Sequence, residues 1–189
     1  LSARPTMSFQ AVAYPLRLVE MAARVESHIA SLLASGVVEA LDYACLNDFC
    51  LLDSSICSYA AGAVVALVGR NEGGKTLSRS TVTAVLDNVF TFFDPSHPEI
   101  MLSCAKVVTP ARRVATMAVA DANKKFMLEH DKLLHILAAG LILDDDNPRR
   151  GQDGADALQE LCAGVLHELA LYGPGAAALQ AHKPTMDAL

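Results

Sequence analysis

Residues 69–76, with the sequence GRNEGGKT, match the phosphate-binding pattern G-x-x-x-x-G-K-[ST] at every fixed position. In such a loop, backbone amides at the start of a helix hold the phosphates, the lysine reaches the β- and γ-phosphates, and the hydroxyl binds Mg²⁺. Lys75 and Thr76 would fill the last two roles. Asp144 or Asp145 would supply the carboxylate that helps to hold the metal. One hypothesis is therefore a nucleotide hydrolase that uses this loop.

The elements around the loop decide between that hypothesis and a simple turn. A phosphate loop follows a strand of a parallel sheet. The apolar run AAGAVVALV before the loop could pass for a strand, but the chain has few other β-branched runs. Residues 15–35 instead repeat apolar side chains at three- and four-residue steps, which predicts a helix. A glycine-rich turn between two helices explains GRNEGGKT without a phosphate, and we prefer this interpretation.

No other group of residues forms a catalytic or metal-binding pattern in the sequence. His130 and His135 are five residues apart, so they do not share a helix face. The aspartates at 144–146 lack the alternating spacing and final glutamate of an EF-hand loop. Serine, histidine and aspartate occur, but nothing ties them into a triad. The sequence therefore predicts no catalysis, metal or cofactor in this segment.

The composition narrows the class of partner and the compartment. The 189-residue chain has a formal net charge of −6 and lacks the basic stripe that is typical of nucleic-acid binding. Its five cysteines form no C-x-x-C pair, which indicates reduced thiols and a cytoplasmic protein. No run of about 18 apolar residues occurs, so we expect no membrane span.

Four segments of the chain share one order of features. Each has an alanine- and leucine-rich helix end, a short polar break, a short helix and another apolar helix. Leu77, Phe126 and Leu179 fall at equivalent places, about 50 residues apart. Such repetition is typical of helical repeat proteins, in which neighbouring units bury the faces that one unit cannot bury alone. The segments are LVEMAARVESHIASLLASGVVEAL, AAGAVVALVGRNEGGKTLSRSTVTAVL, RRVATMAVADANKKFMLEHDKLLHIL and CAGVLHELALYGPGAAALQAHKPTMDAL.

These segments resemble armadillo repeats. In that family a helix ending in A-x-x-A-L-x-N-L-A is followed by a loop ending in N-K, a short helix, and an h-h-x-x-L helix. AAGAVVALVGRNEGGK matches the helix end and the loop, with Gly74 in place of the loop asparagine. ANKKFMLEHDKLLHIL matches the loop and the next helices, and LLASGVVEAL matches the exit of the short helix. The resemblance implies an all-α, right-handed solenoid of about four partial repeats, with residues 1–189 as one domain.

Two insertions depart from the usual repeat length of about 40 residues. One lies around FFDPSHPEI, and the other is the polar stretch 144–156, which we expect to form a mobile surface loop. The last unit breaks off at Leu189, where an apolar face would remain open. We therefore expect a fragment of a longer solenoid, with the rest of the parent chain covering its ends.

The resemblance also implies where a partner would bind. Third helices line a concave groove in this family, and in nuclear-import adaptors they carry a Trp and an Asn one turn apart that hold an extended peptide. Neither residue is present at the matching places here, so we do not expect that mode of peptide binding. The tryptophan places correspond to Leu16, Gly62, Arg112 and Gly164, and the asparagine places to Glu20, Ala66, Thr116 and Glu168.

The residues at these places predict a different partner. Gly62 and Gly164 would leave notches for a helix or a bulky side chain. Glu20 and Glu168 would make parts of the groove acidic, and Arg112 would interrupt it. We therefore expect a protein or peptide ligand of basic or amphipathic character. The predicted binding residues are Glu20, Gly62, Ala66, Arg112, Thr116, Gly164 and Glu168.

The sequence thus predicts a non-catalytic scaffold or adaptor segment that binds a partner through a concave helical surface. Two alternatives stay open. One is the nucleotide hydrolase that uses residues 69–76, and the other is a regulatory armadillo segment that restrains an enzyme domain elsewhere in the parent chain. An almost purely helical structure favours the solenoid, whereas substantial strand would exclude it.

Overall fold

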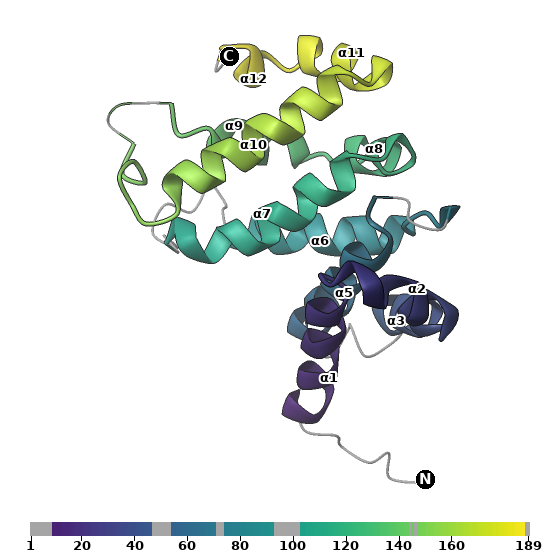
Figure 1. The fold of residues 1–189 in the computed structure, drawn as a ribbon. Coiled ribbons are helices and arrows are strands. Elements are labelled where there is room, and N and C mark those ends of the chain that lie inside the picture. Colours follow the sequence, from purple (N-terminus) through teal and green to yellow (C-terminus); the bar gives the residue numbers. More distant parts are fainter. Residues whose placement is uncertain are drawn as a thin grey trace, which may run out of the picture.

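The computed structural model describes residues 9–46, 54–70, 74–92, 103–143, 145 and 147–187. Within these ranges the chain forms eleven helices and no strand, which confirms the all-α prediction. The helices follow the order of the chain from one end of the molecule to the other (Figure 1). No helix in these ranges is both long and apolar enough to cross a bilayer.

The helices differ in length, and the longest of them, α10, has 16 residues. The bounds are α1 (Phe9–Ala22), α2 (Glu26–Ala34), α3 (Val37–Leu46), α5 (Ser54–Val68), α6 (Arg79–Phe92), α7 (Cys104–Ala118), α8 (Asp121–Leu128), α9 (Leu133–Gly140), α10 (Ala155–Ala170), α11 (Gly173–Ala181) and α12 (Lys183–Asp187).

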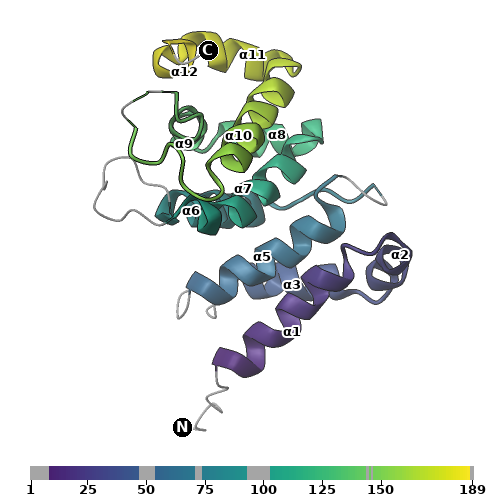
Figure 2. The ribbon, with the colours of Figure 1, turned by 60° about the vertical axis from the view of Figure 1, so that its left-hand side comes forward.

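Four of these helices, α1, α5, α7 and α10, pack against one another in chain order. Helix α5 packs against both α1 and α7, and α7 in turn packs against α10. Helix α6 contacts α5 and α7, while α8 lies against α6 and α7. In Figure 2, α1, α2, α3 and α5 form one end of the molecule, and α11 and α12 form the other. Because α5 touches α1, α3, α6 and α7, it is the centre of the N-terminal half.

The middle of α5 is built from small residues. Ala60, Ala61 and Ala63 have no exposed surface, and Val64 is 1% exposed. Small side chains let neighbouring helix backbones approach closely, so that several helices can pack around one. The composition of α5 therefore explains why it can pack against five neighbouring helices, α1, α2, α3, α6 and α7.

The single helix predicted for residues 15–35 is two helices. Helix α1 ends at Ala22 and α2 begins at Glu26, because the backbone is extended at Val25, with φ −100° and ψ 107°. The three- and four-residue spacing of apolar side chains continues through this break, so the pattern could not locate it. Within α1, Leu18 and Met21 follow the apolar spacing, yet they are 64% and 62% exposed.

The polar stretch 144–156 is shorter than predicted, because α10 already begins at Ala155. Its described residues lie against the start of α7. The Gln152 Oε1 atom accepts a hydrogen bond from the Cys104 backbone amide at 3.3 Å. A Cβ atom on Gly154, which has a φ of +83°, would lie 2.7 Å from the Cα atom of Ala105. The described part of this stretch therefore contacts the start of α7.

One buried asparagine joins the ends of two long helices. Asn123, near the start of α8, is 1% exposed. Its Nδ2 atom donates to the carbonyl of Gly69 after α5, at 2.8 Å, and to that of Met117 in α7, at 3.2 Å. Its Oδ1 atom accepts from the Leu77 amide at 3.4 Å. The side chain thus satisfies backbone groups that helix ends leave without intrahelical partners.

Replacing this asparagine tests its structural role. Asn123→Ala leaves a buried carbonyl and a buried amide without these partners, so we expect the free energy of unfolding to fall by about 2–4 kcal/mol. Urea denaturation followed by circular dichroism measures the change. Lys125→Ala, at an exposed position of the same helix, is the control and should cost less than about 0.5 kcal/mol. Equal losses for the two variants would contradict the role of Asn123.

Candidate functional site: a groove rich in arginine

A groove of about 890 Å³ is lined by residues of α1, α2, α5 and α7. Its four arginines are Arg24, Arg70, Arg112 and Arg113, and we call it the arginine groove. Helix α5 contacts both α2 and α7, so the groove lies along α5 between these two helices. Its volume falls in the range of about 300–1,000 Å³ that is usual for binding clefts.

Five of the seven predicted binding residues line this groove. They come from three different helices that are far apart in the sequence, so the fold brings them together. The other two, Gly164 and Glu168, lie on α10 and do not line it. Leu16, at the first tryptophan place, is 8% exposed and belongs to the core. The residues that line the groove are Glu20, Gly62, Ala66, Arg112 and Thr116.

Glu20 is held by an arginine that the sequence analysis did not single out. The Glu20 side chain is 10% exposed and that of Arg113 is 11% exposed. Arg113 Nη2 lies 2.8 Å from Glu20 Oε2, and Nε lies 3.3 Å from Oε1. Arg24 Nη2 also lies 3.3 Å from Glu20 Oε1. This two-pronged contact between α7 and α1 is the geometry in which a guanidinium binds a carboxylate most strongly.

Helix α5 lies between these partners, and Gly62 provides the space for the contact. A Cβ atom on Gly62 would lie only 2.4 Å from Cζ of Arg113. One turn earlier on α5, the oxygen atoms of Ser58 lie 3.4 Å from Arg113 Nη1. The notch predicted at Gly62 is therefore filled by the protein's own guanidinium, and it is not open to a partner.

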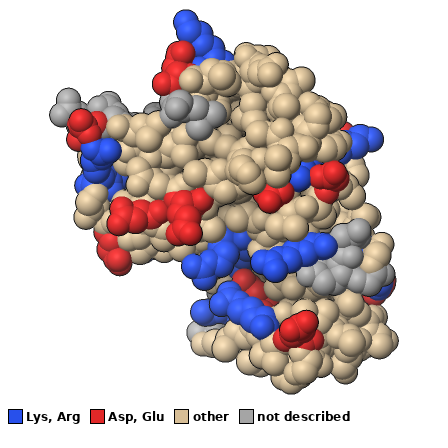
Figure 3. Space-filling view, turned by 45° about the horizontal axis from the view of Figure 1, so that its top comes forward, with Lys and Arg blue, Asp and Glu red and all other residues tan. Residues whose placement is uncertain are grey.

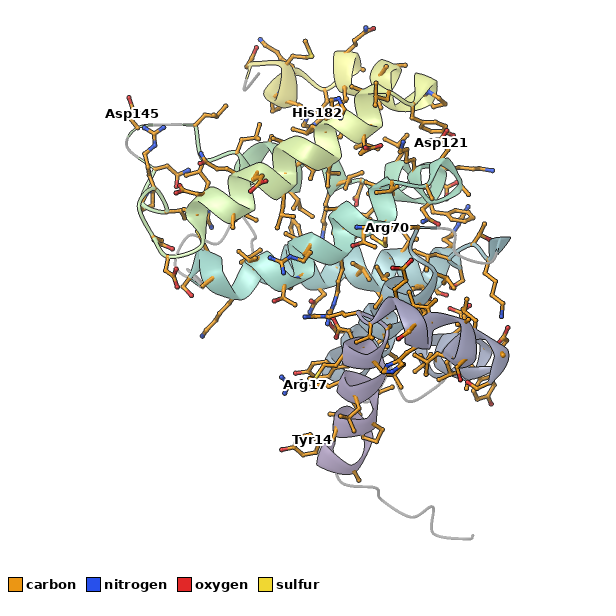
Figure 4. The ribbon with its side chains drawn as sticks, in the orientation of Figure 1. Tyr14, Arg17, Arg70, Asp121, Asp145 and His182 are labelled. Atoms are coloured by element: carbon orange, nitrogen blue, oxygen red, sulfur yellow. The ribbon has the colours of Figure 1, made fainter. Side chains whose placement is uncertain are left out.

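Glu168 is also paired within the protein. Lys124 is 3% exposed, and its Nζ atom lies 3.3 Å from Glu168 Oε2 and 2.8 Å from Asp121 Oδ1. Burial opposes the charge on this ammonium group, but the hydrogen bonds to Asp121 and Glu168 outweigh it and raise the pKa of Lys124. Lys124 stays charged, so much of the negative charge of Glu168 is balanced. In Figure 4, Asp121, the first residue of α8, lies at the right of the upper half of the molecule.

The described residues that line the groove carry more positive than negative charge. It contains four arginines and two glutamates, Glu20 and Glu26, so positive charge is in excess. Figure 3 shows lysine and arginine side chains gathered at the junction between the two halves of the molecule. Arg112 is exposed and forms no ion pair with the described residues, so its charge is available to a ligand.

The groove also has an apolar side. Ile29 and Leu33 of α2 and Val65 of α5 line it beside the arginines. Among the described residues, none of those that line it is aromatic, so they provide no platform on which bases stack in single-stranded nucleic-acid sites. The arrangement suits a ligand that combines anionic and apolar groups.

The GRNEGGKT segment forms no phosphate site in its described residues. The stretch before it is helix α5 rather than a strand, and α6 begins only at Arg79, after the lysine and threonine. Lys75 donates to Glu39 of α3, and this hydrogen bond lowers the pKa of Glu39. Thr76 is exposed, while residues 71–73 and Asp144 lie outside the described residues. The hydrolase hypothesis therefore lacks both the strand and the helix start that it requires.

The need for a basic partner of Glu20 could have been predicted from the sequence. Glu20 follows Leu16 and precedes Ala23 at helical spacing, so it lies on a face that is otherwise apolar. A charge on such a face requires a partner of opposite sign. The signal shows that a basic partner must exist, but it does not show that the partner is Arg113.

The two glycines provide a matched test of the close contact. Gly164→Ala meets no atom within 4 Å and should stabilise α10 by about 0.5–1 kcal/mol. Gly62→Ala forces the guanidinium of Arg113 to move and disturbs its bonds to Glu20, so we expect a net loss of about 1–3 kcal/mol. Urea denaturation measures both changes.

An Arg113→Ala background serves as the internal control for this test. Without the guanidinium, Gly62→Ala should no longer destabilise, because the added methyl group has space and α5 gains helix propensity. The same loss in both backgrounds would show that the cost arises elsewhere.

Comparison of the chain with models of protein families, with curated proteins and with solved structures finds no match to any of them.

Proposed function

We propose that this chain is a non-catalytic scaffold segment that binds an acidic segment of a partner protein in the arginine groove. The observation that carries this proposal is the excess of arginine in a groove that also has an apolar side. Arginine and apolar residues are typical of the parts of protein interfaces that contribute most to affinity.

The fold of this scaffold, we propose, is an armadillo-like, right-handed solenoid. The order of its long helices supports this, since each of α1, α5 and α7 packs against the next one in the chain. Leu67 and Leu169 have no exposed surface, and Leu77 and Leu179, each ten residues later, are 2% and 5% exposed. Equivalent positions of two segments thus have the same environment, as a stack of similar units requires.

The charge that a partner should carry can be inferred from which arginines of the groove are already ion-paired within the protein. Arg113 is committed to Glu20, and Arg24 also lies beside Glu20. Arg112 has no such partner among the described residues. A carboxylate of a partner can accept two parallel hydrogen bonds from a guanidinium of this kind. An extended segment with glutamate or aspartate beside apolar residues fits these groups.

A pair of peptides tests the proposed charge. One is a fluorescein-labelled peptide of about ten residues in which glutamate alternates with leucine, and the other has lysine in place of glutamate. We expect the glutamate peptide to bind and the lysine peptide to bind at least about tenfold more weakly. Fluorescence anisotropy measures both affinities, and the affinity for the glutamate peptide should fall as salt rises.

Variants of the protein locate the binding. Arg112→Gln should weaken binding of the glutamate peptide, because it removes a positive charge. Arg112→Glu should weaken the binding further, because it reverses that charge. Lys183→Glu makes the same change of charge at an exposed residue of α12, away from the groove, and should leave the affinity unchanged. Equal binding of the two peptides, or equal effects at positions 112 and 183, would refute the proposal.

A further inference from the structure

Two histidines that are distant in the sequence meet near the C-terminal end of the molecule. His135 lies on α9, and His182 directly follows α11; Figure 4 shows the position of His182. Their Nε2 atoms are 3.4 Å apart, the ring centroids are 4.5 Å apart, and the ring planes are nearly perpendicular, at 81°. The two nitrogens are closer than the ring centres, so both lie on the facing sides of the rings. We call His135 and His182 the histidine pair.

The separation of the two nitrogens fits a single Zn²⁺ ion. Zn²⁺ binds imidazole nitrogens at about 2.0–2.1 Å and prefers tetrahedral coordination. Two ligands at the tetrahedral angle are then about 3.3–3.4 Å apart, whereas two ligands at a right angle, as in octahedral or square-planar sites, are about 2.9 Å apart. The observed 3.4 Å matches the tetrahedral arrangement. His135 is exposed, so an ion can reach the pair from solvent and this ring has space to turn toward it.

The ring of His182 is held in place by Thr185 of α12, which has no exposed surface. Its Oγ1 atom lies 2.7 Å from Nδ1 of His182, and its backbone amide lies 3.3 Å from the same atom. The backbone amide of His182 in turn donates to carbonyl groups near the end of α11. A hydrogen bond to the second ring nitrogen is the usual way in which a protein orients a metal-binding histidine.

The hydrogen bonds of the pair allow both Nε2 atoms to face one cation. The Thr185 amide can only donate, so we assign Nδ1 of His182 as an acceptor and Nε2 as the protonated nitrogen, which donates to Nε2 of His135. When Zn²⁺ binds, the proton of His182 moves from Nε2 to Nδ1, which then donates to Oγ1 of Thr185. The Thr185 amide keeps its hydrogen bond to the carbonyl of His182, at 3.0 Å. One proton changes place within one ring, and none is released.

The charge state of His182 also suits a metal ligand, because a histidine binds a metal only in its neutral form. Burial, and to a smaller extent the charge of His135, lowers the pKa of His182. The ring of His182 is therefore mostly neutral at pH 7.

We propose that the histidine pair binds one Zn²⁺ ion through the Nε2 atom of each ring, with water at the other two positions of the tetrahedron. In the part of the chain that the structure describes, no three His, Cys, Asp or Glu side chains converge on a metal site, so the protein supplies only these two ligands. The ion links α9 to the segment between α11 and α12. The sequence predicts no metal, because no local pattern joins residues that are 47 positions apart. The site is separate from the arginine groove, whose described lining residues all lie outside these three helices.

Isothermal titration calorimetry of the full chain with ZnCl₂ tests this site. We expect one ion per chain, and a Tm that rises with the Zn²⁺ concentration, because a ligand that binds only the folded state stabilises it. MgCl₂ should give neither effect, since Mg²⁺ takes oxygen ligands. His135→Ala and His182→Asn should each weaken Zn²⁺ binding at least about tenfold. The asparagine at position 182 can keep a hydrogen bond to Thr185 while it removes Nε2.

A third histidine provides the matched control. His167→Ala, at an exposed position of α10, should leave the affinity for Zn²⁺ unchanged. Nitrogen NMR gives an independent readout, in which the Nε2 signals of His135 and His182 should shift on addition of Zn²⁺ while those of His167 should not. Equal affinity of the wild type and the His135→Ala variant would overturn the proposal. A stoichiometry of one ion per two chains would also overturn it, because a second copy would then supply the ligands assigned to water.

Discussion

The ion pair between Glu20 and Arg113 is the contact on which the N-terminal half of the structure depends. It joins α1 to α7 across α5, with Nη2 and Oε2 2.8 Å apart and both side chains about one-tenth exposed. Two charges removed from water are tolerated only while each has its partner, and the loss of either leaves an uncompensated charge. Three helices that are distant in the sequence must therefore keep their relative positions. The walls of the arginine groove are fixed for the same reason.

Two adjacent arginines on α7 consequently have different roles: Arg113 pairs with Glu20, and Arg112 lines the groove. Successive residues of a helix point in directions about 100° apart, so Arg113 can reach inward across α5 while Arg112 faces the groove. The inward residue neutralises the glutamate that would have made the groove acidic. The outward residue then contributes to the sign that a ligand meets. Because Glu20 is paired with Arg113, it adds no unbalanced negative charge to the groove.

Local signals explain how much of this could be predicted from the sequence. Helical periodicity identified an all-α chain, and helix-end matches placed Gly62, Ala66 and Arg112 at positions that the structure brings into one groove. The pairing of Glu20 with Arg113 was not predicted, because the two residues are 93 positions apart and no local pattern links them. Lys124 and Glu168, 44 residues apart, escaped prediction for the same reason.

The break between α1 and α2 shows a different limit of periodicity. Apolar residues continue at helical spacing through Val25, so the pattern predicts one buried face. The backbone is extended at Val25, and Leu18 and Met21 are exposed. Periodicity reports which side chains share a face, but it does not report whether another element covers that face. Coverage depends on tertiary packing. The residues of a long apolar pattern can therefore lie on an exposed surface as well as in a buried core.

The guanidinium of Arg113 occupies the volume that any side chain at position 62 would need. The residue at each of positions 20, 62 and 113 therefore constrains which residues the other two positions can hold. A lineage that gains a side chain at position 62 displaces the arginine and leaves a buried carboxylate unpaired, so it must also lose the charge at position 20. In distantly related proteins with this fold, the three residues should be conserved together or substituted together. This covariation would help to identify the fold where little other sequence similarity remains.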